Sequence, residues 1–497
     1  MRYHSTRSAE DFKSFAEVLV SSYAADGGLY VPETLPAISA EKLASMVSYS
    51  FPQVCAEVMS WFTDIDLDTL RKMATRAYSS FEPEDVLPID RVGEVYHLDT
   101  SLGPTLSFKD VGQQMVAQVL NHVLGRQQRR ATIVVETSGD TGPAAIAGVR
   151  GCDNIDIYCL YPHNRVSRVQ ELQMVTVLDT NVHVYRTEGN TDEQASVLKE
   201  LFADTQFCQQ HNLCSVNSIN WARIAAQSSY YLYCYLRLCK RGVLVMGQTI
   251  NFAVPTGAFG NAMGGYLAQQ MGVPIGRILC ATNANDVVHR TLSCGDMSVG
   301  RNVQTVSPAM DIQTAYNLER MLYYALGQQT APLKSLMLEA EGEKGVQLPA
   351  PLLARVRSTF ASVSVTDEQT LKTIAQVREK HGRLLCPHSA TAVFAATQPL
   401  RYLMAAGAGA EATPTVCVLT AHPAKFEDTI QLATGLQCPI PAAVELLKTF
   451  PKRFKTLQKG ADQAWRAEWI ELLKGDIATG GGGGVGGGGR RSDSSSR

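Results

Sequence analysis

The sequence feature that most constrains the fold is a unit that recurs along the chain, in which a strand-like run leads through a loop into a helix. Residues 131–135 are an apolar run typical of a buried strand, and a helical pattern follows at 144–149. Further strand-like and helical runs lie at 155–160, 182–185, 192–203, 249–254 and 262–271. This alternation favours the α/β class, with parallel sheet covered by helices on both faces.

The segment 103–110, Gly-Pro-Thr-Leu-Ser-Phe-Lys-Asp, places a lysine at the start of a predicted helix. Strand-like alternation at 94–98 precedes it, and Ser107 with Asp110 resembles a capping box. The positive end of the helix dipole and partial burial both lower the pKa of an amine such as that of Lys109. A neutral amine is what Schiff-base chemistry needs. Considered alone, the segment is better explained by an ordinary solvated lysine near a helix start.

Two other loops have the composition of anion sites. The loop 136–143 combines hydroxyls and glycines with a helix start, although a tight turn with capping hydroxyls has the same composition. The loop 255–261 has glycines that let the backbone approach a phosphate closely. It matches neither the dinucleotide fingerprint nor the Walker motif, so the sequence favours a phosphate group but neither NAD nor ATP.

Composition narrows the class of protein. A chain of 497 residues exceeds one ordinary core, and its net charge of −2 gives no electrostatic case for nucleic acid or a membrane surface. No apolar run reaches the ~18 residues of a membrane span, and the first residues do not resemble a secretory signal. The 12 cysteines are scattered without metal-site spacing. We therefore expect a cytoplasmic enzyme with buried free thiols and no metal.

Three parts are expected from shifts in composition. Residues 1–90 carry mostly helical patterns, for example at 16–23 and 68–77, and suggest a mainly helical N-terminal domain. Residues 91–475 hold the alternating strands and helices. Residues 476–497 end in a Gly/Ser/Arg-rich segment that cannot bury apolar area, so we expect a disordered tail.

Four segments in chain order resemble the signatures of threonine synthases, namely 103–110, 138–142, 257–261 and 419–426. The chain is similar to the longer, fungal and bacterial type and to the animal threonine-synthase-like proteins, over roughly residues 1–470. The resemblance implies pyridoxal 5′-phosphate (PLP) as cofactor. It also implies fold type II, the tryptophan synthase β-like scaffold with large and small subdomains, behind the N-terminal domain of threonine synthases.

By matching position, the resemblance implies a role for each motif residue. Lys109 would bind PLP covalently and Thr420 would meet the pyridine nitrogen, although a capping role is the alternative for Thr420. The cofactor phosphate would lie on Gly257, Ala258, Phe259, Gly260 and Asn261. The substrate carboxylate would lie on Ser138, Gly139, Thr141 and Gly142. Because Asp140 cannot bind a carboxylate directly, we interpret it as a brace of its loop.

The implied reaction converts O-phospho-L-homoserine and water to L-threonine and phosphate, with Lys109 moving protons at the α, β and γ carbons. The substrate phosphate then needs a second anion site, for which Arg165, Ser167 and Arg223 are candidates. For each arginine considered on its own, a solvent-exposed position in a loop is at least as good an explanation. The partner is thus a small-molecule substrate, and monomer and homodimer both stay open.

Two departures from the family keep other functions open. Leu102 stands where the family usually has histidine, and the segment 386–390, Cys-Pro-His-Ser-Ala, looks more like the animal proteins. Leu102 leaves the family's histidine role without a candidate at that position, and the segment 386–390 raises the alternative of a phospho-lyase that eliminates phosphate and yields 2-oxobutyrate. A binding protein that kept the fold but lost activity is less favoured, because Lys109, the glycine loop and Thr420 are present together.

Overall fold

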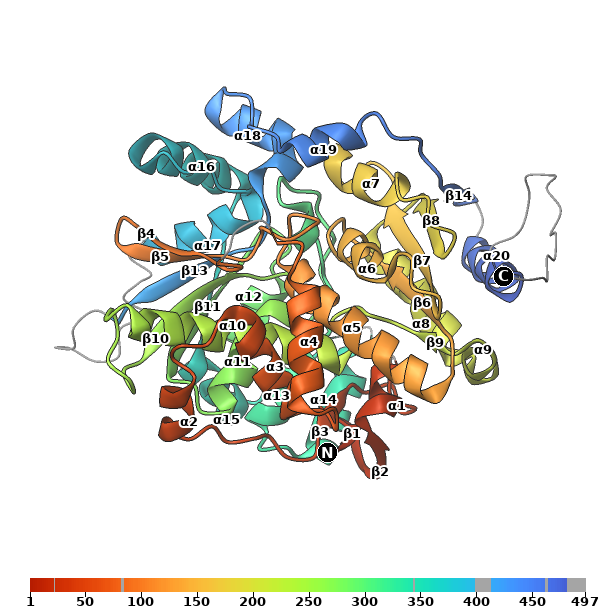
Figure 1. Ribbon diagram of the computed structural model, residues 1–497, viewed down its shortest axis with the longest axis horizontal. Helices are drawn as coiled ribbons and strands as arrows, with labels where there is room; N and C mark the ends of the chain where they lie inside the picture. Colours follow the sequence, from red (N-terminus) through yellow and green to blue (C-terminus); the bar gives the residue numbers. More distant parts are fainter. Residues whose placement is uncertain (22, 82–84, 343–344, 398–412, 461–463, 481–497) are drawn as a thin grey trace, which may run out of the picture.

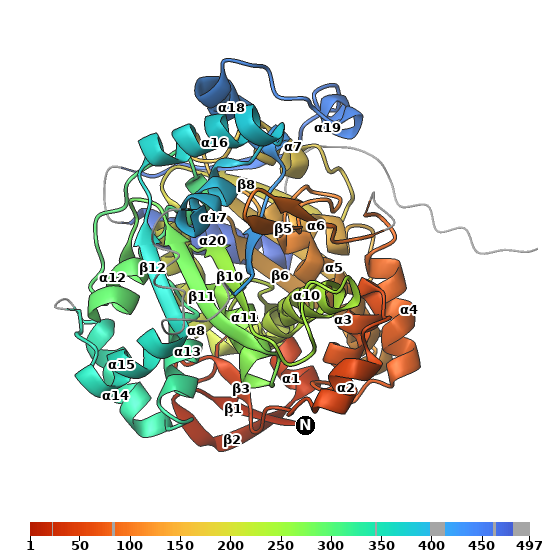
Figure 2. The ribbon, with the colours of Figure 1, turned by 90° about the vertical axis from the view of Figure 1, so that its left-hand side faces the viewer.

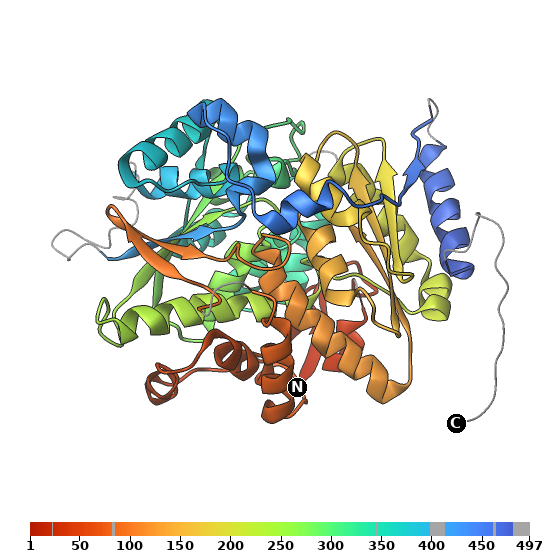
Figure 3. The same cartoon turned by 45° about the horizontal axis from the view of Figure 1, so that its top comes forward.

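The computed structural model describes residues 1–21, 23–81, 85–342, 345–397, 413–460 and 464–480. Two lobes, each built on one sheet of mainly parallel strands, lie side by side (Figure 3). The N-terminal region lies across their base (Figure 1). The predicted α/β class with helix-flanked parallel sheet is confirmed.

The first lobe holds a five-stranded sheet of order β14-β8-β7-β6-β9, in which all neighbours are parallel. Its strands are β6 (Ala131–Glu136), β7 (Ile155–Pro162), β8 (Val182–Thr187), β9 (Leu213–Cys214) and β14 (Lys455–Leu457). Its helices are α5 (Lys109–Gln127), α6 (Thr141–Val149), α7 (Arg168–Val175), α8 (Thr191–Ala203), α9 (Thr205–His211) and α20 (Trp465–Ala478). The C-terminal β14 and α20 return to this lobe from the other one, and Trp465 and Trp469 join its core.

The second lobe holds a six-stranded sheet of order β12-β11-β10-β13-β5-β4, parallel except for the β4-β5 hairpin. Its strands are β4 (Ile89–Val92), β5 (Val95–Asp99), β10 (Ile250–Pro255), β11 (Ile275–Thr282), β12 (Phe360–Ser364) and β13 (Thr415–Leu419). Its α-helices are α10 (Trp221–Lys240), α11 (Gly260–Gln270), α12 (Val287–Cys294), α13 (Leu318–Ala325), α14 (Thr330–Ala340), α15 (Ala350–Thr359), α16 (Asp367–His381), α17 (Pro387–Thr397), α18 (Glu427–Thr434) and α19 (Ala442–Leu447). The described residues of this lobe also form the short 3-10 helices η1 (Pro308–Met310) and η3 (Pro423–Phe426).

Both faces of this second sheet are buried, which explains the continuous apolar runs of its strands. Alternate residues of β10 belong to different hydrophobic cores. Phe252 and Val254 lie in the same core as α11, whereas Ala253 lies in a second core with α17. Figure 2 shows these two helices on either side of the strands. A helix-covered parallel sheet leaves its loops at the carboxyl ends of the strands free to form a site.

The N-terminal region corrects the expectation of a mainly helical domain. It contains an antiparallel sheet of order β2-β1-β3, with β1 (Arg2–Ser5), β2 (Ser8–Ser14) and β3 (Tyr30–Pro32). Its helices are α1 (Phe15–Leu19), α2 (Ala40–Ser45), α3 (Phe51–Ser60) and α4 (Leu67–Ala77). The edge strand β2 escaped sequence reading because it is polar and largely exposed, so pairing with β1 rather than an apolar pattern defines it.

At the other end of the chain, α20 continues to Ala478, past the expected start of the tail at 476. The rest of the predicted tail, 481–497, lies outside the described residues. None of the described helices is long and apolar enough to cross a membrane. Within the same ranges, no three His, Cys, Asp or Glu side chains converge in the way that a metal site requires.

Candidate active site

Backbone hydrogen bonds bring Lys109 and Thr420 together from distant parts of the chain. The Phe108 N–H donates to the Thr420 carbonyl at 2.8 Å, and the His422 N–H donates to the Leu106 carbonyl at 3.0 Å. Helix α5 begins at Lys109, as predicted, so the amine stands at a helix start beside the carboxyl end of β13. Both residues line one cavity between the lobes.

Asp110 holds the loop that precedes Lys109. Its carboxylate accepts from the Thr105 N–H at 2.8 Å and from the Thr105 hydroxyl at 2.6 Å. A Cβ at Gly103 would lie 2.6 Å from the same carboxylate, so only glycine fits there. Ser107 accepts from the Lys109 N–H at 3.2 Å, but Asp110 is directed mainly to Thr105. The predicted capping box is therefore replaced by a turn in which Asp110 bonds mainly to Thr105, and Phe108 rather than Ser107 is at the N-cap position.

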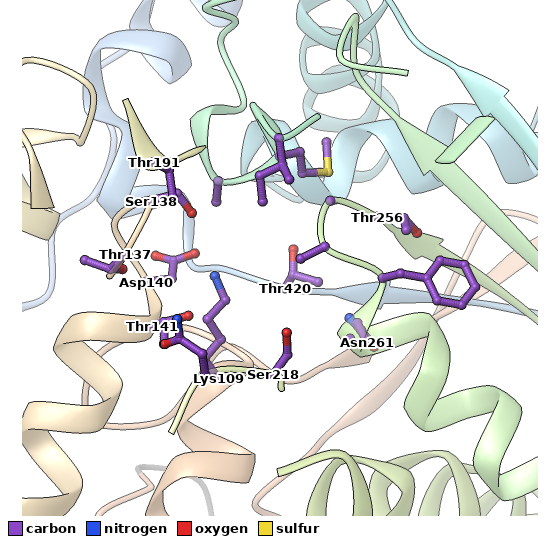
Figure 4. A pocket seen from close by; sticks show the side chains of 18 of the residues that line it. Lys109, Thr137, Ser138, Asp140, Thr141, Thr191, Ser218, Thr256, Asn261 and Thr420 are labelled. Carbon is purple, nitrogen blue, oxygen red and sulfur yellow. The ribbon is translucent and has the colours of Figure 1, made fainter. Parts of the chain in front are cut away.

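The Lys109 amine has the electrostatic environment that the sequence suggested. Burial lowers the pKa of Lys109 to about 8; the Asp140 carboxylate opposes this shift, and the cations Arg223 and Lys425 add to it. In the described part of the chain, the amine has no ion-pair partner, and it points toward the loop that carries Asp140 (Figure 4). Near neutral pH, a far larger fraction of this amine is therefore neutral than in an exposed lysine.

The second predicted loop links β6 to α6 and lies on the same cavity. Ser138 and Thr141 line that cavity. The Thr137 hydroxyl accepts from the N–H groups of Gly139 and Gly142, each at 3.0 Å. Those two N–H groups therefore shape the loop, and the hydroxyls and the remaining N–H groups at the start of α6 are left for a ligand.

Asp140 in this loop is part of a buried ion pair. Its Oδ1 lies 2.8 Å from the Lys425 ammonium and accepts from Gln170 Nε2 at 2.8 Å. Burial alone raises the pKa of a carboxyl, but Lys425, Lys109 and His388 outweigh it and hold the pKa of Asp140 well below its usual range. This arrangement agrees with the interpretation of Asp140 as a brace.

The glycine loop lies between β10 and α11, and all five of its predicted residues line the cavity. A Cβ at Gly260 would lie 2.9 Å from Ser218 Cβ, and a Cβ at Gly257 would lie 3.1 Å from Met310 Cα. Phe259 adopts the left-handed region with φ of 64°. Such a backbone at a non-glycine residue costs about 1–3 kcal/mol and is typical of ligand-binding turns.

Asn261 in this loop is oriented by two tyrosines of α10. The hydroxyls of Tyr230 and Tyr231 donate to Asn261 Oδ1 at 2.5 and 2.7 Å. With its oxygen held in this way, the amide presents Nδ2, which is buried and has no partner among the described residues. The two tyrosines are buried in the core and also orient a side chain of the site.

Thr420 follows β13 and has a similar unsatisfied group. Its N–H donates to the Ser389 hydroxyl at 3.0 Å, while its own hydroxyl is buried without a partner in the described structure. Figure 4 shows Thr420 between Lys109 and Asn261. Buried polar atoms are normally paired, so the Thr420 hydroxyl and Asn261 Nδ2 mark places where a bound molecule completes the hydrogen bonding.

The three candidates for the second anion site are separated by the fold. Arg223 at the start of α10 lines the cavity; it donates to the Val216 carbonyl at 3.1 Å, and its Nε has no partner in the described residues. Arg165 and Ser167 instead line a different cavity. The Ser167 hydroxyl caps α7 by accepting from the Gln170 N–H at 3.2 Å.

Sequence reasoning missed several titratable residues of the cavity, among them His388 and Glu136. Burial lowers the pKa of His388 to about 4, and its Nε2 accepts from the Ala309 N–H at 3.0 Å. The neutral ring then carries its proton on Nδ1, which is buried and unpartnered among the described residues. Burial raises the pKa of Glu136 to about 7. The segments 136–143 and 386–390 had been noted, but neither pattern indicated that these two side chains reach the site.

Three family models together match most of the chain. They are described as threonine synthase N terminus at residues 2–78, pyridoxal-phosphate dependent enzyme at 85–421, and threonine synthase, C-terminal, at 389–467. Among curated proteins, a threonine synthase of Pseudomonas aeruginosa is 39% identical over 89% of this chain and 92% of its own. The threonine synthase-like 2 protein of Xenopus laevis is 38% identical over 96% and 98%.

Solved structures agree with these matches. The PLP-bound threonine synthase from Brucella melitensis superposes with a TM-score of 0.86 at 36% identity, covering 97% of this chain and 100% of that one. The yeast threonine synthase superposes with a TM-score of 0.83 at 31% identity, covering 96% and 99%. The expected family and cofactor class are confirmed. The chain belongs to the threonine synthase family of pyridoxal-phosphate-dependent enzymes.

Proposed function

We propose that this protein converts O-phospho-L-homoserine and water to L-threonine and phosphate. The observation that carries the proposal is the content of one cavity: the Lys109 amine, two buried polar groups on Asn261 and Thr420 that have no partner among the described residues, and the buried cation Arg223. A lysine alone serves many PLP reactions, whereas a second cation in the same cavity suits a substrate that carries its own phosphate.

The residues present fit PLP. The glycine loop and the Asn261 amide would hold the cofactor phosphate at the start of α11, where backbone N–H groups favour an anion. The Thr420 hydroxyl would meet the ring nitrogen, and Lys109 would bond the cofactor. When bound, PLP supplies an electron-withdrawing ring next to the reacting carbon. A neutral hydroxyl on the ring nitrogen makes that ring a milder electron sink than a carboxylate does.

The substrate would lie between the lobes. The Ser138 and Thr141 hydroxyls and the start of α6 would bind its carboxylate, with Gly139 and Gly142 setting the shape of the loop. Arg223 would bind its phosphate. Burial lowers the pKa of Arg223 to about 10, so the guanidinium stays charged at neutral pH. The position of Arg165 and Ser167 on another cavity favours Arg223 over both.

Lys109 would move the protons. Its amine would take the proton from the α carbon of the substrate and move protons at the β and γ carbons as phosphate leaves and water adds. Because burial lowers its pKa, the amine can accept and release protons near neutral pH. His388 offers a further neutral N–H donor on the same cavity.

A phospho-lyase that yields 2-oxobutyrate is the second candidate. The observation that favours it is the similarity to threonine synthase-like 2 proteins, which is as high as that to threonine synthases. Both reactions share every step up to the loss of phosphate. They differ in whether water adds at the β carbon before the product leaves, so product identity separates them.

The test is product analysis. Purified protein is incubated with PLP and O-phospho-L-homoserine, and phosphate, threonine and 2-oxobutyrate are each quantified. Threonine in equal amount to phosphate supports the proposal, whereas 2-oxobutyrate in its place overturns it in favour of the lyase. The Lys109→Ala variant is the control, and it should fold but release no phosphate. Absence of all three products from the unmodified protein would favour an inactive binding protein.

A further inference from the structure

A buried ion pair next to the candidate cofactor lysine has no part in the proposed reaction. Lys425 on η3 is fully buried, and its ammonium lies 2.8 Å from Asp140 Oδ1 and 2.8 Å from the Thr105 carbonyl. Gln173 Nε2 donates to the same carbonyl at 3.0 Å. The pair therefore joins the loop before α6, the loop before α5 and the segment after β13, which are three of the predicted motif segments.

The position of Asp140 creates an electrostatic problem. Its carboxylate lines the same cavity as the Lys109 amine, and Figure 4 shows the amine pointing toward it. An unpaired carboxylate at this place would attract the amine and hold it in the charged form. A charged amine has no lone pair with which to bond an aldehyde or accept a proton.

We propose that Lys425 is a positioning residue, which binds and neutralises Asp140 so that the Lys109 amine can lose its proton near neutral pH. Lys425 acts twice in the same direction: it engages Asp140 Oδ1, and its own charge disfavours a second cation nearby. Gln170 supports the pair by donating to Asp140 Oδ1 at 2.8 Å. The inference rests on the proposed role of Lys109 but not on the identity of the product.

Other ionisable groups around Lys109 do not replace this pair. They come from α5, β6, α8, α10 and α17, and are Asp110, Glu136, Asp192, Arg223 and His388, with Tyr316 from the segment before α13. Asp110 is engaged with Thr105, and Asp192 accepts from Asn302 Nδ2 at 3.0 Å. Burial lowers the pKa of His388 to about 4, so its ring is neutral where Lys109 titrates, and burial raises the pKa of Glu136 to about 7. Arg223 is a cation that also disfavours a charged Lys109. Asp140 is the carboxylate whose charge opposes the lowering of the Lys109 pKa, so its pairing with Lys425 bears directly on the charge of the amine.

The test measures the pKa of Lys109 directly, in full-length protein freed of cofactor. A trace of acetic anhydride is reacted at a series of pH values, and acetylation of Lys109 is quantified by mass spectrometry relative to the exposed Lys372. Three variants are compared: Lys425→Met, Asp140→Asn, and the double variant. Lys474→Met is the matched control, because it removes a lysine from an ion pair with Asp204, and neither of these residues lines the cavity.

We expect Lys425→Met to raise the pKa of Lys109 by about one unit or more, and Asp140→Asn to lower it. The double variant should return close to the unmodified protein, and Lys474→Met should change nothing. Unchanged values in both single variants, or shifts in the same direction, would overturn the proposal. Should Lys425→Met fail to fold, Asp140→Asn and the double variant, which leaves no buried unpaired charge, still decide it.

The pKa of Lys109 measured by acetylation tests the role of Lys425 separately from the proposed function. Acetylation needs neither substrate nor turnover, so the expected shifts can appear in a protein that forms no threonine. Conversely, a protein that makes threonine while Lys109 keeps one pKa in all variants refutes the role of Lys425 alone. In the PLP-loaded protein, the pH at which the visible absorbance changes should move in the same direction for each variant.

Discussion

The two tyrosines behind Asn261 allow a sharp test of how the cofactor phosphate is held. Tyr230 and Tyr231 both donate to Asn261 Oδ1, so replacing either with phenylalanine leaves the other to orient the amide. We expect each single variant to weaken PLP binding by less than about 1 kcal/mol, which is under about fivefold in Kd.

The double variant should behave differently. With both hydroxyls gone, the buried amide oxygen loses its partners, and the amide can turn away from the phosphate. Restoring it on binding costs on the order of 2 kcal/mol, which predicts about thirtyfold weaker PLP binding. The assay is titration of cofactor-free protein with PLP, followed by visible absorbance.

Tyr235→Phe is the matched control for this series. Tyr235 lies on the same helix and its hydroxyl also makes a hydrogen bond, accepting from the Gly247 N–H at 2.7 Å, away from the cavity. It should lose similar thermal stability without any change in Kd. If the Tyr230→Phe/Tyr231→Phe variant binds PLP as tightly as Tyr235→Phe does, the orientation of Asn261 has no part in cofactor binding.

The remaining predictions concern the lysine, a buried ion pair and the C-terminus. The rate of PLP capture by cofactor-free protein should rise about tenfold per pH unit below pH 8 and level off above it, because burial lowers the pKa of Lys109 to about 8 and the neutral amine reacts; a flat stopped-flow profile would contradict this. Arg7→Met should cost about 3–5 kcal/mol in urea unfolding, because it leaves Glu319 buried, with a side chain only 6% exposed, and without its bidentate partner; a loss below about 1 kcal/mol would refute it. Removing 481–497 should leave the melting temperature unchanged, because the buried residues of α20 all precede that segment; a lower Tm would show that the segment contributes to folding.

The sequence by itself determined the local units of this protein. Apolar runs with loops of glycine and hydroxyls predicted β6, β7, β8 and β10, and the start of α5 at Lys109, because strand and helix periodicity and turn chemistry act over short distances. The four motif segments also indicated the family and the cofactor, which the comparisons confirmed.

Tertiary structure decided which of these units share a site. Lys109 and Thr420 are neighbours because β5 pairs with β13, and Arg223 reaches the cavity whereas Arg165 and Ser167 do not. The roles of Lys425 and the polar edge strand β2 likewise appear only in the folded chain. Strand order and long-range packing set these relations, and they depend on contacts between distant segments that leave no local pattern in the sequence.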